Sequence, residues 1–79
     1  MIIIDEKNKK FVKKYIPNYN DILEATTPRD ALIAFSHWIN IEESCWDETG
    51  YNYSDLGRQA QSVYDDILYN NVYANKQKA

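Results

Sequence analysis

The chain has 79 residues, a formal net charge of −3 and 44% hydrophobic residues. This length suits a single domain over 1–79, and the apolar share is that of a folded protein rather than a disordered one. Only two glycines and two prolines are present, which argues against an all-β fold because such folds need many turns. The single cysteine, Cys45, excludes an internal disulfide framework and a cysteine-based zinc site.

The sequence lacks the apolar runs that membrane proteins carry. The opening "MIII" is too short for the core of a signal sequence, and Asp5 and Glu6 follow it directly. No other run approaches the length of a membrane span. We therefore expect a cytoplasmic protein that does not contact membranes.

The charges are unevenly distributed along the chain. Residues 1–14 hold five lysines and two acids, a net charge of +3, whereas residues 15–75 hold two arginines and ten acids, a net charge of −8. Lys76 and Lys78 make the tail basic again. Because an acidic body repels phosphate backbones, direct nucleic-acid binding is expected only at the ends, if anywhere.

The first segment predicts an amphipathic helix over roughly 5–15. Its apolar residues, such as Phe11, recur at helical spacing while its lysines lie on the other face. Pro17 ends this helix, because the residue before a proline avoids helical geometry. A short strand at Ile2–Ile4 is the alternative for the three isoleucines.

Two further helices follow. A short one is expected near 19–25, with an asparagine available as its N-cap. The clearest start in the chain predicts a long helix over about 28–46: Thr27 is a good N-cap, Pro28 suits the first helical position, and Asp30 places negative charge in the first turn.

The last predicted helix spans about 54–72, with Ser54 as its N-cap. Gly57 is unusual in an early helical turn, where glycine is less favourable than alanine by about 1 kcal/mol. A backbone or a bulky side chain that passes close by would explain it. Residues 74–79 are expected to be a frayed tail.

These elements predict an all-α fold. The two long helices are joined by about seven residues, a normal length for antiparallel neighbours. We expect a small helical bundle built on that antiparallel hairpin, with the N-terminal helix and the short helix closing its open side.

The stretch "WDETGYNYSD", residues 46–55, connects the two long helices and resembles a calcium loop only superficially. An EF-hand needs glycine at its sixth position and glutamate at its twelfth. Counted from Asp47, Gly50 is fourth and Arg58 is twelfth. We expect no metal and no cofactor here, and a turn in which Gly50 supplies a positive φ.

Groups for catalysis are sparse, and we expect a protein that is not an enzyme. His37 and Cys45 would lie about 12 Å apart on one helix, beyond hydrogen-bond reach. Adjacent carboxylates on a helix point about 100° apart and do not converge. No phosphate loop or nucleophile elbow is present. A helix-turn-helix interpretation fails on charge, because helix 54–72 carries three aspartates against Arg58 alone.

Glu42 falls in the middle of the apolar half of the long helix 28–46. A buried, unpaired carboxylate is unfavourable, so three explanations stay open. The helix loosens near residue 41 and releases Glu42, or Arg58 or Arg29 pairs with it, or this end of the apolar face is covered by a partner.

The candidate binding surface consists of acids and aromatic residues in the connector and on the last helix. Exposed tyrosines among acids resemble protein-interface chemistry, because tyrosine offers a large contact area with a polar tip. The candidate residues are Glu42, Glu43, Trp46, Asp47, Glu48, Tyr51, Tyr53, Asp65, Asp66, Tyr69 and Tyr73.

These features favour a non-catalytic acidic module that binds a basic surface of a larger protein. If that surface normally holds nucleic acid, the module would inhibit the larger protein by charge mimicry, and a protein of phage or mobile-element type is then expected. One alternative is a self-assembling structural or adaptor homodimer that uses Ile2–Ile4. A second is a nucleic-acid binder that uses Lys9, Lys10 and Lys13 on the first helix.

Overall fold

The computed structural model describes residues 2–73, and four α-helices form within them. They are α1 (Glu6–Tyr15), α2 (Tyr19–Leu23), α3 (Pro28–Ile41) and α4 (Asp55–Leu68), joined by a 3₁₀ turn, η1 (Glu43–Cys45), after α3 and a π-helical turn, η2 (Tyr69–Tyr73), after α4. No strand forms among residues 2–73, so the predicted all-α class is confirmed. The predicted tail 74–79 lies outside the described residues.

Capping side chains define where three of these helices begin. Asp5, Thr27 and Ser54 each accept the backbone N–H of the residue three positions later, at 2.8, 3.2 and 3.1 Å. These bonds satisfy donors that have no partner inside the helix. The caps predicted at Thr27 and Ser54 are confirmed.

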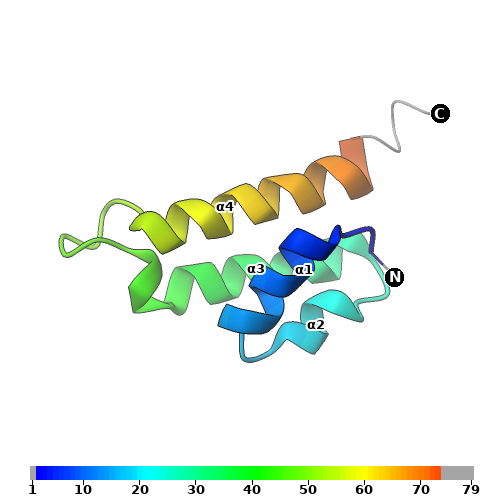
Figure 1. Cartoon of the computed structure of the whole chain (residues 1–79), viewed down its shortest axis with the longest axis horizontal. Coiled ribbons are helices and arrows are strands. Elements are labelled where there is room, and N and C mark those ends of the chain that lie inside the picture. Colours follow the sequence, from blue (N-terminus) through cyan, green and yellow to red (C-terminus); the bar gives the residue numbers. More distant parts are fainter. Residues whose placement is uncertain (1, 74–79) are drawn as a thin grey trace.

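The helices enclose one apolar core. Figure 1 shows α3 and α4 side by side, with α2 packed against α3 and α1 next to α2. Phe35 on α3 is fully buried, and its ring packs edge-on against Trp38 and Tyr64, with centroids 6.2 and 6.1 Å away. All four helices contribute to the core, whose largest fully buried side chains are Phe35, Ile16, Ile22, Ile67, Val12 and Cys45.

The predicted helix 28–46 was too long, because α3 ends at Ile41. Glu42 adopts extended geometry (φ −85°, ψ 110°), and its carboxylate accepts the backbone N–H of Ser44 at 3.3 Å, which starts η1. Glu42 is half-buried rather than enclosed in the core. The explanation that the helix loosens near residue 41 is therefore confirmed, and the physical reason is the burial cost that a continued helix would impose on the carboxylate.

Neither arginine pairs with Glu42. Arg58 forms its ion pair with Asp55 instead, and Arg29 forms no ion pair with any residue from 2 to 73. The second explanation for Glu42 was therefore wrong. The third, a covering partner, stays a prediction.

The three N-terminal isoleucines do not form a strand. They precede α1 without regular secondary structure, and Ile2 is 8% exposed while Ile3 is 58% exposed. The Asn71 side chain takes the place of a neighbouring strand: its Oδ1 accepts the Ile3 N–H at 2.6 Å, and its Nδ2 donates to the carbonyls of Ile3 and Ile67, both at 2.8 Å. The predicted helix 54–72 is α-helical only as far as Leu68, where α4 ends, and the π-helical turn η2 follows it.

Candidate functional site

The connector between α3 and α4 is a closed loop rather than a loose link. Trp46 and Tyr53 form an isolated antiparallel bridge. Next to it, the Asp47 N–H donates to the Asn52 carbonyl at 2.8 Å, and the Ser54 N–H donates to the Cys45 carbonyl at 3.0 Å. The two ends of the loop are therefore joined by backbone hydrogen bonds.

Asp47 organises the tip of this loop. Its Oδ1 accepts the backbone N–H groups of Thr49 and Gly50, at 3.0 and 3.2 Å, and the Gly50 N–H also donates to the Asp47 carbonyl at 3.0 Å. The hydrogen bond from the Thr49 hydroxyl is the largest cause that holds the pKa of Asp47 below its usual value. Gly50 has φ 77°, as predicted, a conformation that other residues rarely adopt.

Two aromatic side chains support the loop from inside. The rings of Trp46 and Tyr53 stack with centroids 4.8 Å apart. The Trp46 indole N–H donates to the Ile39 carbonyl at 2.9 Å, and the Tyr53 hydroxyl donates to Gln61 on α4 at 3.0 Å. Both side chains are half-buried, so they are less exposed than the tyrosine at the loop tip, and their role as contact residues stays a prediction. The polar groups of both rings are already satisfied within the fold.

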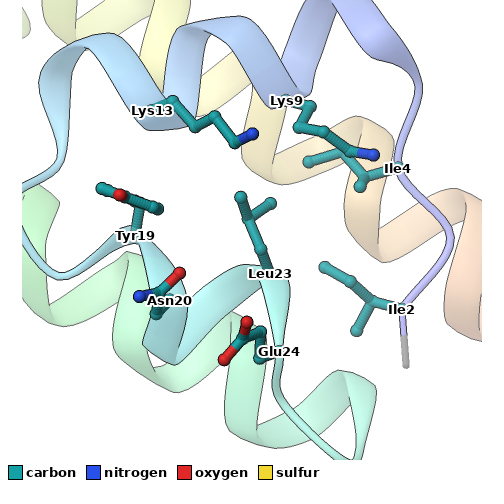
Figure 2. Close-up of a pocket in the computed structure, with 8 residues that line it drawn as sticks. All are labelled: Ile2, Ile4, Lys9, Lys13, Tyr19, Asn20, Leu23 and Glu24. Carbon is teal, nitrogen blue, oxygen red and sulfur yellow. The ribbon is translucent and has the colours of Figure 1, made fainter.

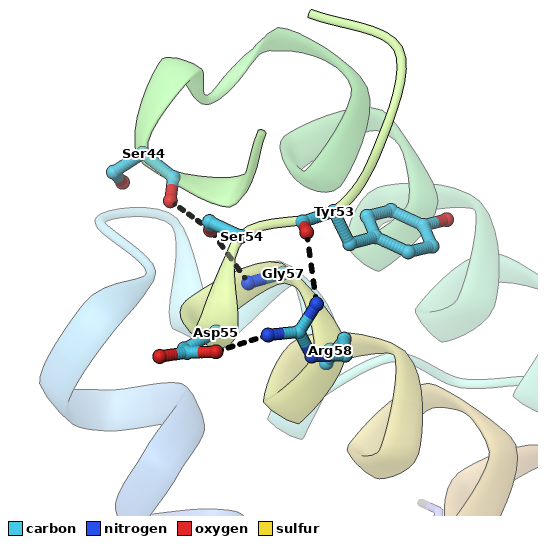
Figure 3. A network of polar contacts seen from close by, with 6 residues as sticks. All are labelled: Ser44, Tyr53, Ser54, Asp55, Gly57 and Arg58. Carbon is cyan, nitrogen blue, oxygen red and sulfur yellow. Dashed lines mark hydrogen bonds and ion pairs between the residues drawn. The ribbon is translucent and has the colours of Figure 1, made fainter. Parts of the chain in front are cut away.

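Close contact between η1 and α4 anchors the base of the loop (Figure 3). A Cβ atom on Gly57 would lie 1.9 Å from the Cys45 carbonyl oxygen, so only glycine allows this approach. This confirms the backbone explanation for Gly57. The Ser54 hydroxyl donates to the Ser44 carbonyl, and Arg58 donates to the Tyr53 carbonyl at 3.2 Å.

A shallow hollow opens where the end of α3 meets this loop. Among its lining residues are the acids Glu43, Asp47 and Glu48, and also Ile41, whose side chain is 64% exposed. Tyr51, at the tip, is 88% exposed. Within residues 2–73 none of the three acids forms an ion pair, because the two ion pairs there are Lys9–Glu6 and Arg58–Asp55. We call the hollow and Tyr51 the connector site; the hollow is lined by Asn40, Ile41, Glu43, Trp46, Asp47, Glu48, Thr49 and Gly50.

The remaining candidate residues form a separate group. Asp65 and Asp66 lie on α4, and Tyr69 and Tyr73, 52% and 50% exposed, lie on η2. At 1.5 Å per residue, Asp65 lies about 15 Å along α4 from its first residue, where the connector ends. The structure therefore divides the predicted surface into two patches instead of bringing it together.

The acids of this second patch have polar partners. Asp65 accepts a hydrogen bond from Gln61 at 3.0 Å, and Asp66 accepts one from Asn8 on α1 at 3.0 Å. Asp66 therefore helps to hold α1 against α4. The connector acids Glu43 and Glu48 have no such hydrogen bonds within residues 2–73, which makes them the more available charges.

Cys45 and His37, which were considered above as a nucleophilic pair, lie in different surroundings. Cys45 is fully buried, and burial, followed by the charge of Glu42, raises the pKa of its thiol, which disfavours the nucleophilic thiolate. His37 is exposed on α3. Among residues 2–73 no three His, Cys, Asp or Glu side chains gather as they would around a metal ion.

Sequence reasoning missed two parts of the surface. Ile41 belongs to the connector site, and an isoleucine that directly follows the polar Asn40 at a helix end was the available signal. The second part is a hollow between the N-terminal segment, α1 and α2, which depends on how three separate segments pack. No local pattern indicates such a hollow.

Comparison with known proteins assigns no relative. No protein-family model matches the chain, and neither the curated proteins nor the solved structures contain a significant match. Within residues 2–73, none of the helices combines the length and the apolar character that a membrane crossing requires.

Proposed function

We propose that this chain is a non-catalytic cytoplasmic module that binds a basic surface of a larger protein through the connector site. The supporting observation is that the Glu43 and Glu48 carboxylates, which form no ion pair in the described chain, line a hollow together with the exposed Ile41, and that the adjoining loop tip exposes Tyr51. Carboxylates attract a basic partner and orient it, whereas apolar and aromatic contacts provide short-range affinity.

The hydrogen bonds inside the connector support the proposal further. A loop that is already ordered loses little conformational entropy when it binds, so more of the contact energy appears as affinity. In this view α3 and α4 act as an antiparallel hairpin that holds the connector at one end. The stacked Trp46 and Tyr53 rings would then support the connector from inside rather than contact the partner first.

An arginine-rich surface is the partner chemistry that fits best. A guanidinium group can hydrogen-bond a carboxylate while its plane lies on an apolar or aromatic surface. If the partner's basic surface is its nucleic-acid site, then occupation by this chain excludes nucleic acid and inhibits the partner. The acids would then stand in for backbone phosphates.

Affinity capture with matched charge variants tests the proposal. The baits are the wild-type chain, the connector variant Glu43→Gln/Glu48→Gln, and the control Asp65→Asn/Asp66→Asn, which removes the same net charge from α4. We expect one protein to be retained by the wild type and by the control, and to be lost with the connector variant. Equal retention by all three baits, or loss only with the control, would contradict the connector site.

The inhibitor hypothesis needs a second measurement. The retained protein is mixed with its nucleic acid, and the wild-type chain is then titrated into the complex. Displacement of the nucleic acid by the wild type, and much weaker displacement by the connector variant, is the expected result. A stable ternary complex would exclude mimicry while leaving the module's binding role intact.

A further inference from the structure

The hollow between the N-terminal segment, α1 and α2 has chemistry opposite to that of the connector site (Figure 2). Its volume of about 530 Å³ lies within the range of small-molecule sites. Leu23 points into it from α2 and Ile2 from the N-terminal segment, so its floor is apolar. Its lining residues are Ile2, Ile4, Lys9, Lys13, Tyr19, Asn20, Leu23 and Glu24.

Two cations lie along one edge of this apolar floor. Lys9 and Lys13 are one helical turn apart on α1, and Figure 2 shows both along the α1 side of the hollow. Lys13 forms no ion pair with the residues from 2 to 73, and Lys9 pairs only with Glu6, at 3.4 Å. Like charges at this spacing repel each other, so an anion between them would relieve the repulsion.

We propose that this hollow binds a small anionic amphiphile, that is, a carboxylate with an alkyl chain. The carboxylate would lie between the ammonium groups of Lys9 and Lys13, and the chain would cover Ile2, Ile4 and Leu23. Glu24 lines the hollow on the side away from the lysines, so its charge repels the carboxylate and directs it towards α1.

The lysines of α1 do not all belong to this hollow. Lys10 and Lys14 are exposed on the same helix but do not line the hollow. The five lysines of α1 are therefore divided between the two that line the hollow and the three that do not. An apolar floor beside two cations suits a ligand that combines one negative charge with a hydrocarbon body, rather than a phosphate backbone.

Titration with decanoate, followed by ¹H–¹⁵N NMR of the full chain, tests the proposal. We expect saturable shifts in the amides of α1, α2 and residues 2–4, with little change in the connector. Acetate, which lacks the chain, and decanol, which lacks the charge, should each bind at least about tenfold more weakly. Equal binding of decanol or acetate would overturn the proposal, and so would shifts centred elsewhere.

Matched lysine variants test whether Lys9 and Lys13 bind the carboxylate. Lys9→Gln/Lys13→Gln should weaken decanoate binding by about tenfold or more, whereas Lys10→Gln/Lys14→Gln, with the same net charge, should leave it close to wild type. All four positions lie at the helix surface, so circular dichroism should show that both variants keep their fold. Equal weakening in both variants would show that only overall charge attracts the ligand and would overturn the site.

Two further experiments separate this proposal from membrane binding and from the proposed protein-binding function. Vesicles that contain anionic phospholipid should not compete with decanoate, because the hollow accommodates a single free molecule; tight vesicle binding that depends on Lys9 and Lys13 would overturn the proposal. The connector variant Glu43→Gln/Glu48→Gln should bind decanoate like the wild type. A failure to bind decanoate therefore does not affect the proposed protein-binding function. A failure of partner binding at the connector site likewise does not affect the decanoate site.

Discussion

The two ends of the molecule are fastened in different ways. At the connector end, the backbone of η1 touches α4 at Gly57, and several backbone hydrogen bonds close the loop. At the N-terminal end, the amide of Asn71 alone provides both hydrogen bonds to Ile3. Backbone contacts form a foundation that few substitutions can remove, whereas a clasp made by one side chain can be removed by a single substitution.

The two ends also differ in charge. The connector site is lined by three acids, and the hollow at the N-terminal end by two lysines and one glutamate. The overall net charge of −3 hides this separation. A partner that is selected by charge would therefore recognise one end and avoid the other.

Gly57→Ala should have the largest effect. Helix propensity alone predicts stabilisation by up to about 1 kcal/mol. The clash with the Cys45 carbonyl, which is backbone and cannot easily move, predicts destabilisation by about 3 kcal/mol instead. Urea denaturation followed by tryptophan fluorescence gives the sign. A variant more stable than the wild type would contradict the tight contact between η1 and α4.

Asn71→Ala should have the second largest effect and destabilise the fold by about 2 kcal/mol. It removes the hydrogen bonds to Ile3 and Ile67 and leaves partly buried backbone groups unsatisfied. Asn70→Ala is the matched control. Hydrogen exchange should show faster exchange of the Ile3 amide in the Asn71 variant only. Indistinguishable stability of the two variants would show that the N-terminal segment does not depend on this clasp.

Gly50→Ala should have the third largest effect and destabilise the fold by about 1 kcal/mol. Alanine is strained at a φ of 77°, even though open space surrounds the position. The same urea titration measures it. The strain lies in the loop tip, so partner capture should weaken along with stability. A neutral substitution would show that the tip adapts and is less ordered than its hydrogen bonds imply.

Asp47→Asn should have the smallest effect, and one that depends on pH. The folded state lowers the pKa of Asp47, so its contribution to stability is present above the ordinary carboxyl pKa and is lost as pH falls through the lowered value. The difference in urea midpoint between wild type and variant should therefore shrink as the pH falls from about 6 to below the ordinary aspartate pKa of about 3.9. A difference that stays constant over this range would mean that the Asp47 charge does not stabilise the loop.

The sequence indicated the helices well wherever a local signal exists. Thr27 and Ser54 mark their helix starts with side chains that cap in any context, and Gly57 signalled a close contact by being a poor helix former. The apolar periodicity did not predict that α3 ends at Ile41. The apolar pattern continues past this residue, but a longer helix would bury the Glu42 carboxylate, which is unfavourable.

The site was less predictable because it depends on packing between distant segments. Nothing near Asn71 in the sequence indicates that it pairs with a residue 68 positions away. Trp46 and Tyr53 were predicted only as candidate contact residues, because their stacking is visible only once the connector closes. The acids of the connector and of α4 were grouped by residue type, and only the structure separates them.

The ionic-strength dependence of binding tests the connector site most directly. The affinity of the captured partner is measured for the wild type and for Glu43→Gln/Glu48→Gln from about 0.01 to about 1 M ionic strength, over which the screening length falls from about 30 to about 3 Å. We expect wild-type affinity to fall steeply with salt, and the variant to bind weakly with a much shallower dependence. A wild-type affinity that is unchanged across this range would contradict an acidic docking surface.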